Sequence, residues 1–189
     1  MDGLKAGPPA IHPCSTVAFE NLRLQYRPEK IQVLFVAESR PIGGTFFYAG
    51  NSHLVRYTAE AFRKAYGGNA TTMADFLDGF KAAGCYLEDL CPEPVNHIKA
   101  HALRRAEWKR SVGYLSRRME SASPSAIIPI HKGSEPYVIQ AAQEAGFLDR
   151  LKPAIPFPSM GNHPRYIAEL SRIILELREA SILPAEFPA

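Results

Sequence analysis

Short apolar runs and longer amphipathic stretches alternate along the chain. The apolar runs are rich in β-branched residues and predict strands buried on both faces, at residues 31–37, 85–90, 126–130 and 154–157. The amphipathic stretches have apolar positions three and four residues apart and predict helices at about 16–23, 53–65, 73–83, 99–121, 134–145 and 166–178. Pro129 inside the third run indicates an edge strand or an early strand end.

The alternation of strands with helices predicts the fold class. It is typical of an α/β protein with a three-layer arrangement, in which a mostly parallel central sheet of about four strands is flanked by helices. We expect a single domain over residues 16–180. Residues 1–15, punctuated by Gly and Pro, form an N-terminal arm in this interpretation, and residues 181–189 form a C-terminal tail.

Composition narrows the class of protein. Hydrophobic residues make up 46% and charged residues 22% of the 189 residues, which indicates a folded chain with a substantial core. The three cysteines form no CxxC pair, so we expect reduced thiols in a cytoplasmic protein, with no bound metal and no cofactor. No apolar run reaches the length of a membrane span and no signal peptide is recognised, so no membrane association is expected.

Candidate chemistry follows the predicted strands. Ligands of open parallel sheets collect at the carboxyl ends of the strands, where this chain places Glu38 and Arg40, then Asp89, then His131 and Lys132. The phosphate-binding loop GxxxxGK[ST], the dinucleotide motif GxGxxG after the first strand, the GxSxG nucleophile elbow and HExxH are all absent. Nucleotide hydrolysis, dinucleotide redox chemistry and serine-hydrolase chemistry are therefore disfavoured.

Two segments resemble motifs of a known family. The first is the strand Val33-Leu-Phe-Val-Ala-Glu38 followed by Gly44-Thr-Phe-Phe-Tyr-Ala-Gly-Asn-Ser-His-Leu54, and the second is Pro156-Phe-Pro-Ser-Met-Gly-Asn-His-Pro164 before the last helix. Together they resemble the two motifs of the uracil-DNA glycosylase superfamily, in a branch without an iron–sulfur cluster. The order of elements matches over about residues 31–178. The resemblance implies a DNA glycosylase-like protein that hydrolyses the N-glycosidic bond of a deaminated or damaged base, either uracil or a deaminated purine, flipped out of DNA.

The resemblance gives roles to residues of the first motif. Glu38 corresponds to the acidic residue that positions or activates the attacking water, and general-base assistance is typically worth roughly 10²–10⁴ in rate. Phe46 or Phe47 would stack on the extruded base. Two structural interpretations remain open, namely a loop-capping Glu38 and a phenylalanine pair of which at least one ring belongs to the core.

Two positions depart from the family pattern. Asp89 stands where many relatives carry Asn, and an ionised Asp only accepts hydrogen bonds, so it suits an N–H-rich base edge or needs a raised pKa to mimic the amide. Phe157 stands where the family usually has His, and His163 could supply the missing imidazole to stabilise charge on the departing base.

Contacts with DNA are expected from three places along the chain: the second-motif loop, the basic segment 99–118, and Lys132 with Ser134 near the start of a predicted helix. Met160 is the predicted wedge that fills the gap left by the flipped nucleotide. Seven Lys or Arg residues from Lys99 to Arg118 against Glu107 give a local net charge of +6, whereas the whole chain carries +3, which favours a phosphate-binding patch or a solvated helix face. The predicted DNA-contact residues are Arg104, Arg105, Lys132, Ser134, Ser159, Met160, Asn162 and Arg165.

Two other functions remain open. A catalytically inactive nucleic-acid-binding protein on the same fold would explain the departures at Asp89 and Phe157. A metal-assisted hydrolase of a small nucleotide or ester would use Glu38, Asp89, His131 and His163, although their spacing matches no known ligand signature. The expected partner in the main interpretation is DNA with a damaged or deaminated base, bound by a monomer.

Overall fold

Three parallel strands, β1 (Val33–Ala37), β2 (Cys85–Asp89) and β3 (Ala126–Pro129), form a sheet in the order β2–β1–β3. Every residue of these strands is buried, as expected for continuous apolar strands covered on both faces. The computed structural model describes residues 16–68 and 72–188, so the expected N-terminal arm lies outside the described residues. The α/β class is confirmed.

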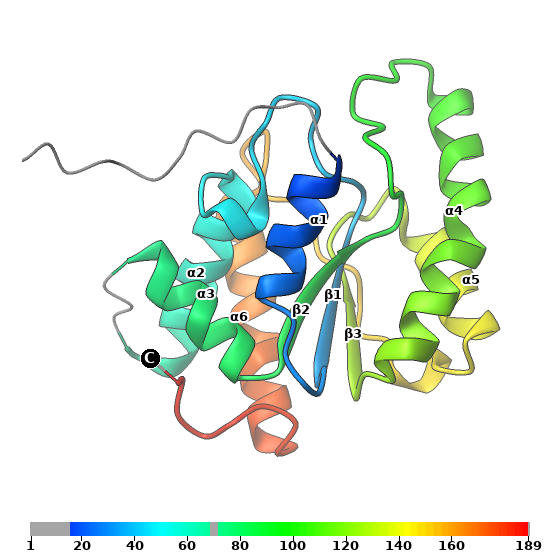
Figure 1. The fold of residues 1–189 in the computed structure, drawn as a ribbon. Coiled ribbons are helices and arrows are strands. Elements are labelled where there is room, and N and C mark those ends of the chain that lie inside the picture. Colours follow the sequence, from blue (N-terminus) through cyan, green and yellow to red (C-terminus); the bar gives the residue numbers. More distant parts are fainter. Residues whose placement is uncertain (1–15, 69–71, 189) are drawn as a thin grey trace, which may run out of the picture.

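Helices cover both sides of the sheet (Figure 1). On one side lie α4 (His101–Ala122) and α5 (Glu135–Glu144). On the other side lie α1 (Thr16–Gln25), α2 (His53–Tyr66), α3 (Met73–Ala82) and α6 (His163–Glu179). Two short 3₁₀ helices, η1 (Phe47–Ala49) and η2 (Leu148–Arg150), lie in the connecting segments. All six helices predicted from the sequence are present. In the described ranges, no helix combines the length and the apolar character needed to cross a membrane.

The fourth predicted strand does not form. Ile155 makes an isolated bridge to Ile130, just after β3, and Leu151 makes another to Ile127 of β3. The amides of Lys152 and Ile155, three positions apart, donate to the carbonyls of Ile127 and Pro129, which are only two positions apart. Pro153 lies between the two donors and has no N–H of its own, so a regular ladder cannot continue there. β3 is consequently an edge strand of the three-stranded sheet and ends at Pro129, as that proline predicts.

The segment between β1 and α2 is fixed by local hydrogen bonds. Ser52 is the N-cap of α2, and its hydroxyl accepts from the Val55 amide at 3.2 Å. The Asn51 Oδ1 accepts from the Phe46 amide at 2.7 Å, and Gly50 adopts the left-handed region with φ 70°. These contacts turn the aromatic loop back over the ends of β1 and β2.

The expected C-terminal tail packs against α2 and α3 over its described part, residues 181–188. The Phe187 ring contacts the rings of Phe62 and Tyr66, with centroids 5.4 Å away in both cases. The Tyr66 hydroxyl donates to the Pro184 carbonyl at 3.0 Å. This segment therefore completes the core on that side of the sheet.

Candidate functional site

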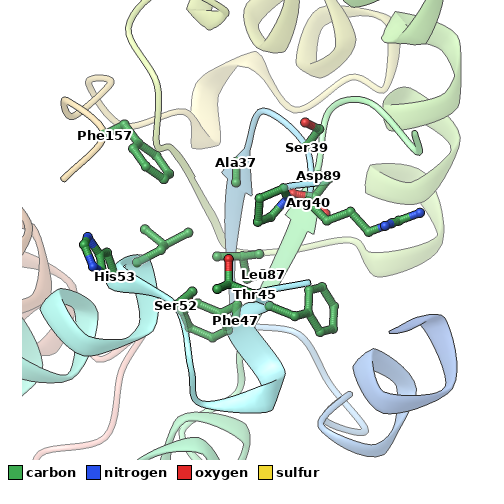
Figure 2. A pocket seen from close by; sticks show the side chains of 13 residues that line it. Ala37, Ser39, Arg40, Thr45, Phe47, Ser52, His53, Leu87, Asp89 and Phe157 are labelled. Atoms are coloured by element: carbon green, nitrogen blue, oxygen red, sulfur yellow. The ribbon is translucent and has the colours of Figure 1, made fainter. Parts of the chain in front are cut away.

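A cavity of about 320 Å³ lies at the carboxyl ends of β1 and β2, on the side of α2 (Figure 2). Its aromatic walls come from Phe46, Phe47 and Phe157. Its polar side chains come from Ser39, Arg40, Thr45, Ser52, His53 and Asp89. The cavity therefore lies where ligands of open parallel sheets bind.

Several residues selected from the sequence meet in this cavity. Phe46, Phe47, Asp89 and Phe157 come from three distant segments, and all four line it. Both phenylalanines of the first motif contribute, although each also packs into the core, where Phe46 meets Phe19 with ring centroids 5.1 Å apart. Both rings therefore belong to the core as well as to the cavity wall, and the core contacts hold them in place, while the stacking role stays a prediction.

Asp89 is 4% exposed and is paired with a buried arginine of α1. Arg23 Nη2 donates to Asp89 Oδ2 at 2.5 Å, while Nη1 donates to Glu88 Oε1 at 2.8 Å and to the Leu87 carbonyl at 3.2 Å. Since Asp89 and Glu88 point to opposite faces of β2, Arg23 holds both carboxylates from the edge of the sheet. Glu88 is also bound by Arg118 of α4, whose Nε donates at 2.5 Å.

Burial and charge oppose each other in this cluster. Burial lowers the pKa of Arg23, but the negative charges of Asp89 and Glu88 outweigh it and raise that pKa well above its ordinary value. Burial raises the pKa of Glu88, against the effect of Arg23 and Arg118. The two arginines therefore limit how far the Glu88 carboxyl is pushed towards its neutral form.

Glu38 does not line the cavity. Side chains alternate along a strand, and here Ala37 and Ser39 face the cavity while Glu38 faces α4. Arg104 donates to both of its carboxylate oxygens, with Nε 2.5 Å from Oε1, and Trp108 Nε1 donates to Oε1 at 2.8 Å. The catalytic role of Glu38 stays a prediction, and the structure brings its carboxylate to the other face of the sheet from Asp89.

His163 lies outside the cavity as well. Its ring stacks on Tyr57, with centroids 4.9 Å apart and an interplanar angle of 15°. Tyr57 also meets the ring of His53 edge-on, with centroids 6.2 Å apart, and His53 lines the cavity. The imidazole that the structure brings to the cavity is therefore that of His53, at the first turn of α2.

The expected DNA contacts around the second motif lie on the surface. Ser159, Met160, Asn162 and Arg165 are all exposed at the start of α6. Met160 is 98% exposed and has φ 50°, the left-handed region that disfavours residues with a side chain. Phe157 begins this loop in the cavity wall, so the loop runs from the cavity to an exposed tip.

Some of the remaining expected DNA-contact residues are exposed, whereas others already interact with neighbouring side chains of the protein. Lys132 and Arg105 are exposed, whereas Ser134 is 2% exposed and its hydroxyl lies 3.1 Å from His131 Nδ1. Three of the seven cationic side chains around α4, those of Arg104, Arg110 and Arg118, form ion pairs. The exposed cationic residues of that segment are Lys99, Arg105, Lys109, Arg110 and Arg117.

The residues of the metal-assisted alternative are dispersed. Within the part of the chain that the structure describes, no three His, Cys, Asp or Glu side chains are grouped so that they could hold a metal ion. Glu38 lies on the α4 side of the sheet, where burial lowers the pKa of nearby His131 and the Glu38 charge raises it in part. Asp89 faces the cavity, and His163 stacks on Tyr57.

Sequence reasoning missed Arg23, Ser39 and His53. Strand alternation beyond Ala37 could have identified Ser39, and the helix start after Ser52 could have identified His53. Two adjacent acids in a buried strand require a cation, but nothing local identifies Arg23 as its source. Comparison of the sequence with known protein families and with curated proteins finds no match.

Proposed function

We propose that the protein binds a deaminated or damaged base, turned out of DNA, in the cavity at the ends of β1 and β2, and hydrolyses its N-glycosidic bond. The observation that supports this proposal is that Phe46, Phe47 and Asp89 line one cavity. The sequence resemblance alone connects these three residues with base binding.

The size and walls of the cavity suit a single base. Its volume of about 320 Å³ lies at the lower end of the range for small-molecule sites, roughly 300–1,000 Å³. Phe157 lies across the opening from Phe47 in Figure 2, which leaves aromatic surface on two sides. Base–aromatic stacking is worth roughly 1–3 kcal/mol and offsets part of the few kcal/mol needed to unstack a base from the duplex.

Hydrolysis of the glycosidic bond passes through an oxocarbenium-like sugar, which a nearby carboxylate stabilises. Asp89 lies in the cavity wall, and Glu38 lies at the end of β1 on the opposite face. In this proposal Glu38 remains the carboxylate that positions water. Arg104 is 25% exposed, so a DNA phosphate can compete with Glu38 for its guanidinium and release the carboxylate.

A binding protein without hydrolytic activity is the second candidate. It is favoured by the orientation of Glu38, whose carboxylate accepts from Arg104 and Trp108 instead of facing the cavity. Such a protein would bind DNA through the exposed basic residues and the second-motif loop. Its affinity would fall steeply with salt, because phosphate contacts release counterions.

The two candidates are distinguished by base release from labelled oligonucleotides that carry uracil, hypoxanthine or xanthine, in single and double strands. The glycosylase proposal predicts abasic sites and a loss of at least tenfold in rate for Glu38→Gln, with DNA affinity retained. Glu120→Gln, the same change at an exposed position of α4, is the matched control and should keep full activity.

Each negative result has a definite meaning. Salt-dependent DNA binding without release of any of the three bases, or of a damaged guanine, would select the binding protein. Release at the normal rate by the Glu38→Gln protein would show that Glu38 only ties β1 to α4.

A further inference from the structure

The Arg23–Asp89 pair determines what Asp89 offers to a ligand. Both side chains are nearly inaccessible, with Arg23 5% and Asp89 4% exposed, and Arg23 Nη2 lies 2.5 Å from Asp89 Oδ2. A guanidinium can only donate hydrogen bonds, so the oxygen that it meets has to accept. Arg23 and Asp89 thus form a buried ion pair, and a carboxylate has no proton to donate.

An anionic Asp89 presents only acceptors to the cavity. None of the described residues donates a hydrogen bond to its Oδ1, while Oδ2 accepts from Arg23. Each carboxylate oxygen can accept two hydrogen bonds, so both oxygens retain capacity for a ligand. An Asn at this position would instead present one acceptor and one donor.

We propose that Arg23 fixes Asp89 as an acceptor and that the cavity therefore selects a guanine-type edge, in which N1–H and the 2-amino group are adjacent donors. The inference rests on the proposed function, since it names the base that the cavity would take. In DNA the substrate would be a guanine damaged on its imidazole ring, because such damage leaves the N1–H and the 2-amino group unchanged.

Other bases match the acceptor less well. Uracil and xanthine place one N–H between two carbonyl oxygens, and these oxygens would face the negative charge of Asp89. Hypoxanthine keeps the N–H but lacks the neighbouring amino group. Ser39 also lines the cavity, and its Oγ accepts from the Val95 amide at 3.2 Å, so its hydroxyl proton can be donated to a carbonyl oxygen of a ligand. The acceptors of Asp89 thus match the two adjacent donors of a guanine-type edge better than the edges of these other bases.

Nucleotide binding to the full chain tests this inference. Dissociation constants for dGMP, dIMP and dUMP are measured by NMR chemical-shift titration at low salt. A carboxylate that pairs with two donors discriminates by about tenfold or more, so we expect dGMP to bind at least tenfold more tightly than dUMP. dIMP should fall between them.

The Asp89→Asn variant should reduce the dGMP-to-dUMP preference at least tenfold, because its amide donates to a uracil carbonyl. Its own carbonyl oxygen can still accept from Arg23, so the variant is expected to fold, which thermal unfolding verifies. Asp78→Asn removes an equal charge from an exposed position of α3 and should leave the preference unchanged.

Three results would overturn the inference: equal or tighter binding of dUMP by the wild-type chain, no binding of any of the nucleotides, or an unchanged preference in a folded Asp89→Asn protein. If that variant does not fold, the wild-type preference alone decides. Excision of uracil without a dGMP preference would remove this inference and leave the proposed function. A dGMP preference without excision of any base would remove the proposed hydrolysis and leave the selection of a guanine-type edge.

Discussion

Arg23 is the residue whose removal should affect stability most at the site. Its guanidinium is the shared partner of Glu88 and Asp89, both buried in β2. Arg23→Met keeps much of the packing volume but leaves two carboxylates without this cation. Breaking a buried pair in this way costs about 3–5 kcal/mol of unfolding free energy, which urea denaturation measures.

A surface ion pair supplies the comparison for Arg23. Arg172 pairs with Glu176 one turn along α6, at the surface, with side chains 60% and 42% exposed. Such pairs are worth about 0.3–0.5 kcal/mol, so Arg172→Met should hardly change stability. If Arg23→Met costs no more than Arg172→Met, the carboxylates of β2 do not depend on Arg23 for their charge, and the selection of an N–H-rich edge loses its basis.

The residue scale also shows how far the sequence could define the site. The sequence pattern predicted that Asp89 and the phenylalanine pair lie close together, because the carboxyl ends of parallel strands meet at one edge, and these residues do line one cavity. It did not anticipate that Glu38 faces α4, although strand alternation separates it from Ala37. The partner of Asp89 lies 66 positions away on α1, and no local pattern encodes such a distance.

At the scale of elements, the second-motif loop offers a test that separates stability from DNA contact. Met160 holds a left-handed backbone at φ 50° with its side chain almost fully exposed. Met160→Gly should therefore leave stability unchanged or raise it by up to about 1 kcal/mol. If the side chain acts as the wedge in DNA, the same variant should bind duplex DNA several-fold more weakly, as measured by fluorescence anisotropy.

Ser181 provides the matched control for this loop. It also has a left-handed backbone, at φ 57°, and it lies after α6 at the far end of that helix. Ser181→Gly should give the same stability change with no change in DNA affinity. Equal affinities for both variants and the wild-type chain would show that Met160 does not contact DNA.

Elements were predicted best where the chemistry is local. Helix α2 starts within a residue of its expected position, because its Ser52 cap needs only an amide three residues ahead. Ser134 does precede α5, but its hydroxyl contacts His131 and makes no cap hydrogen bond. The last apolar run failed as a strand because pairing with β3 needs a register over several residues, which Pro153 interrupts.

At the scale of the whole molecule, the sheet separates two chemical environments. The cavity side carries aromatic walls with Asp89, and the α4 side carries Glu38 with Arg104 and Trp108. Arg23 joins the two at the β2 edge through Asp89 and Glu88. A substrate that used both carboxylates, Asp89 and Glu38, would have to pass over the end of β1. Binding and hydrolysis are therefore separable by mutation on either face.

The buried tyrosines make the whole fold sensitive to alkali. Burial raises the pKa of Tyr86 from its ordinary value of 10.0 to about 12, and burial also raises the pKa of Tyr48 and of Tyr166 above that ordinary value. The unfolded chain loses these protons near pH 10 and the folded chain retains them, so stability is complete below pH 10 and falls as the pH rises towards 12. Tyr86 alone accounts for up to about 3 kcal/mol of this loss. Urea unfolding at pH 9, 10 and 11, with tyrosinate absorbance at 295 nm, measures both effects. Ionisation of every tyrosine near pH 10 in the folded chain would contradict this packing.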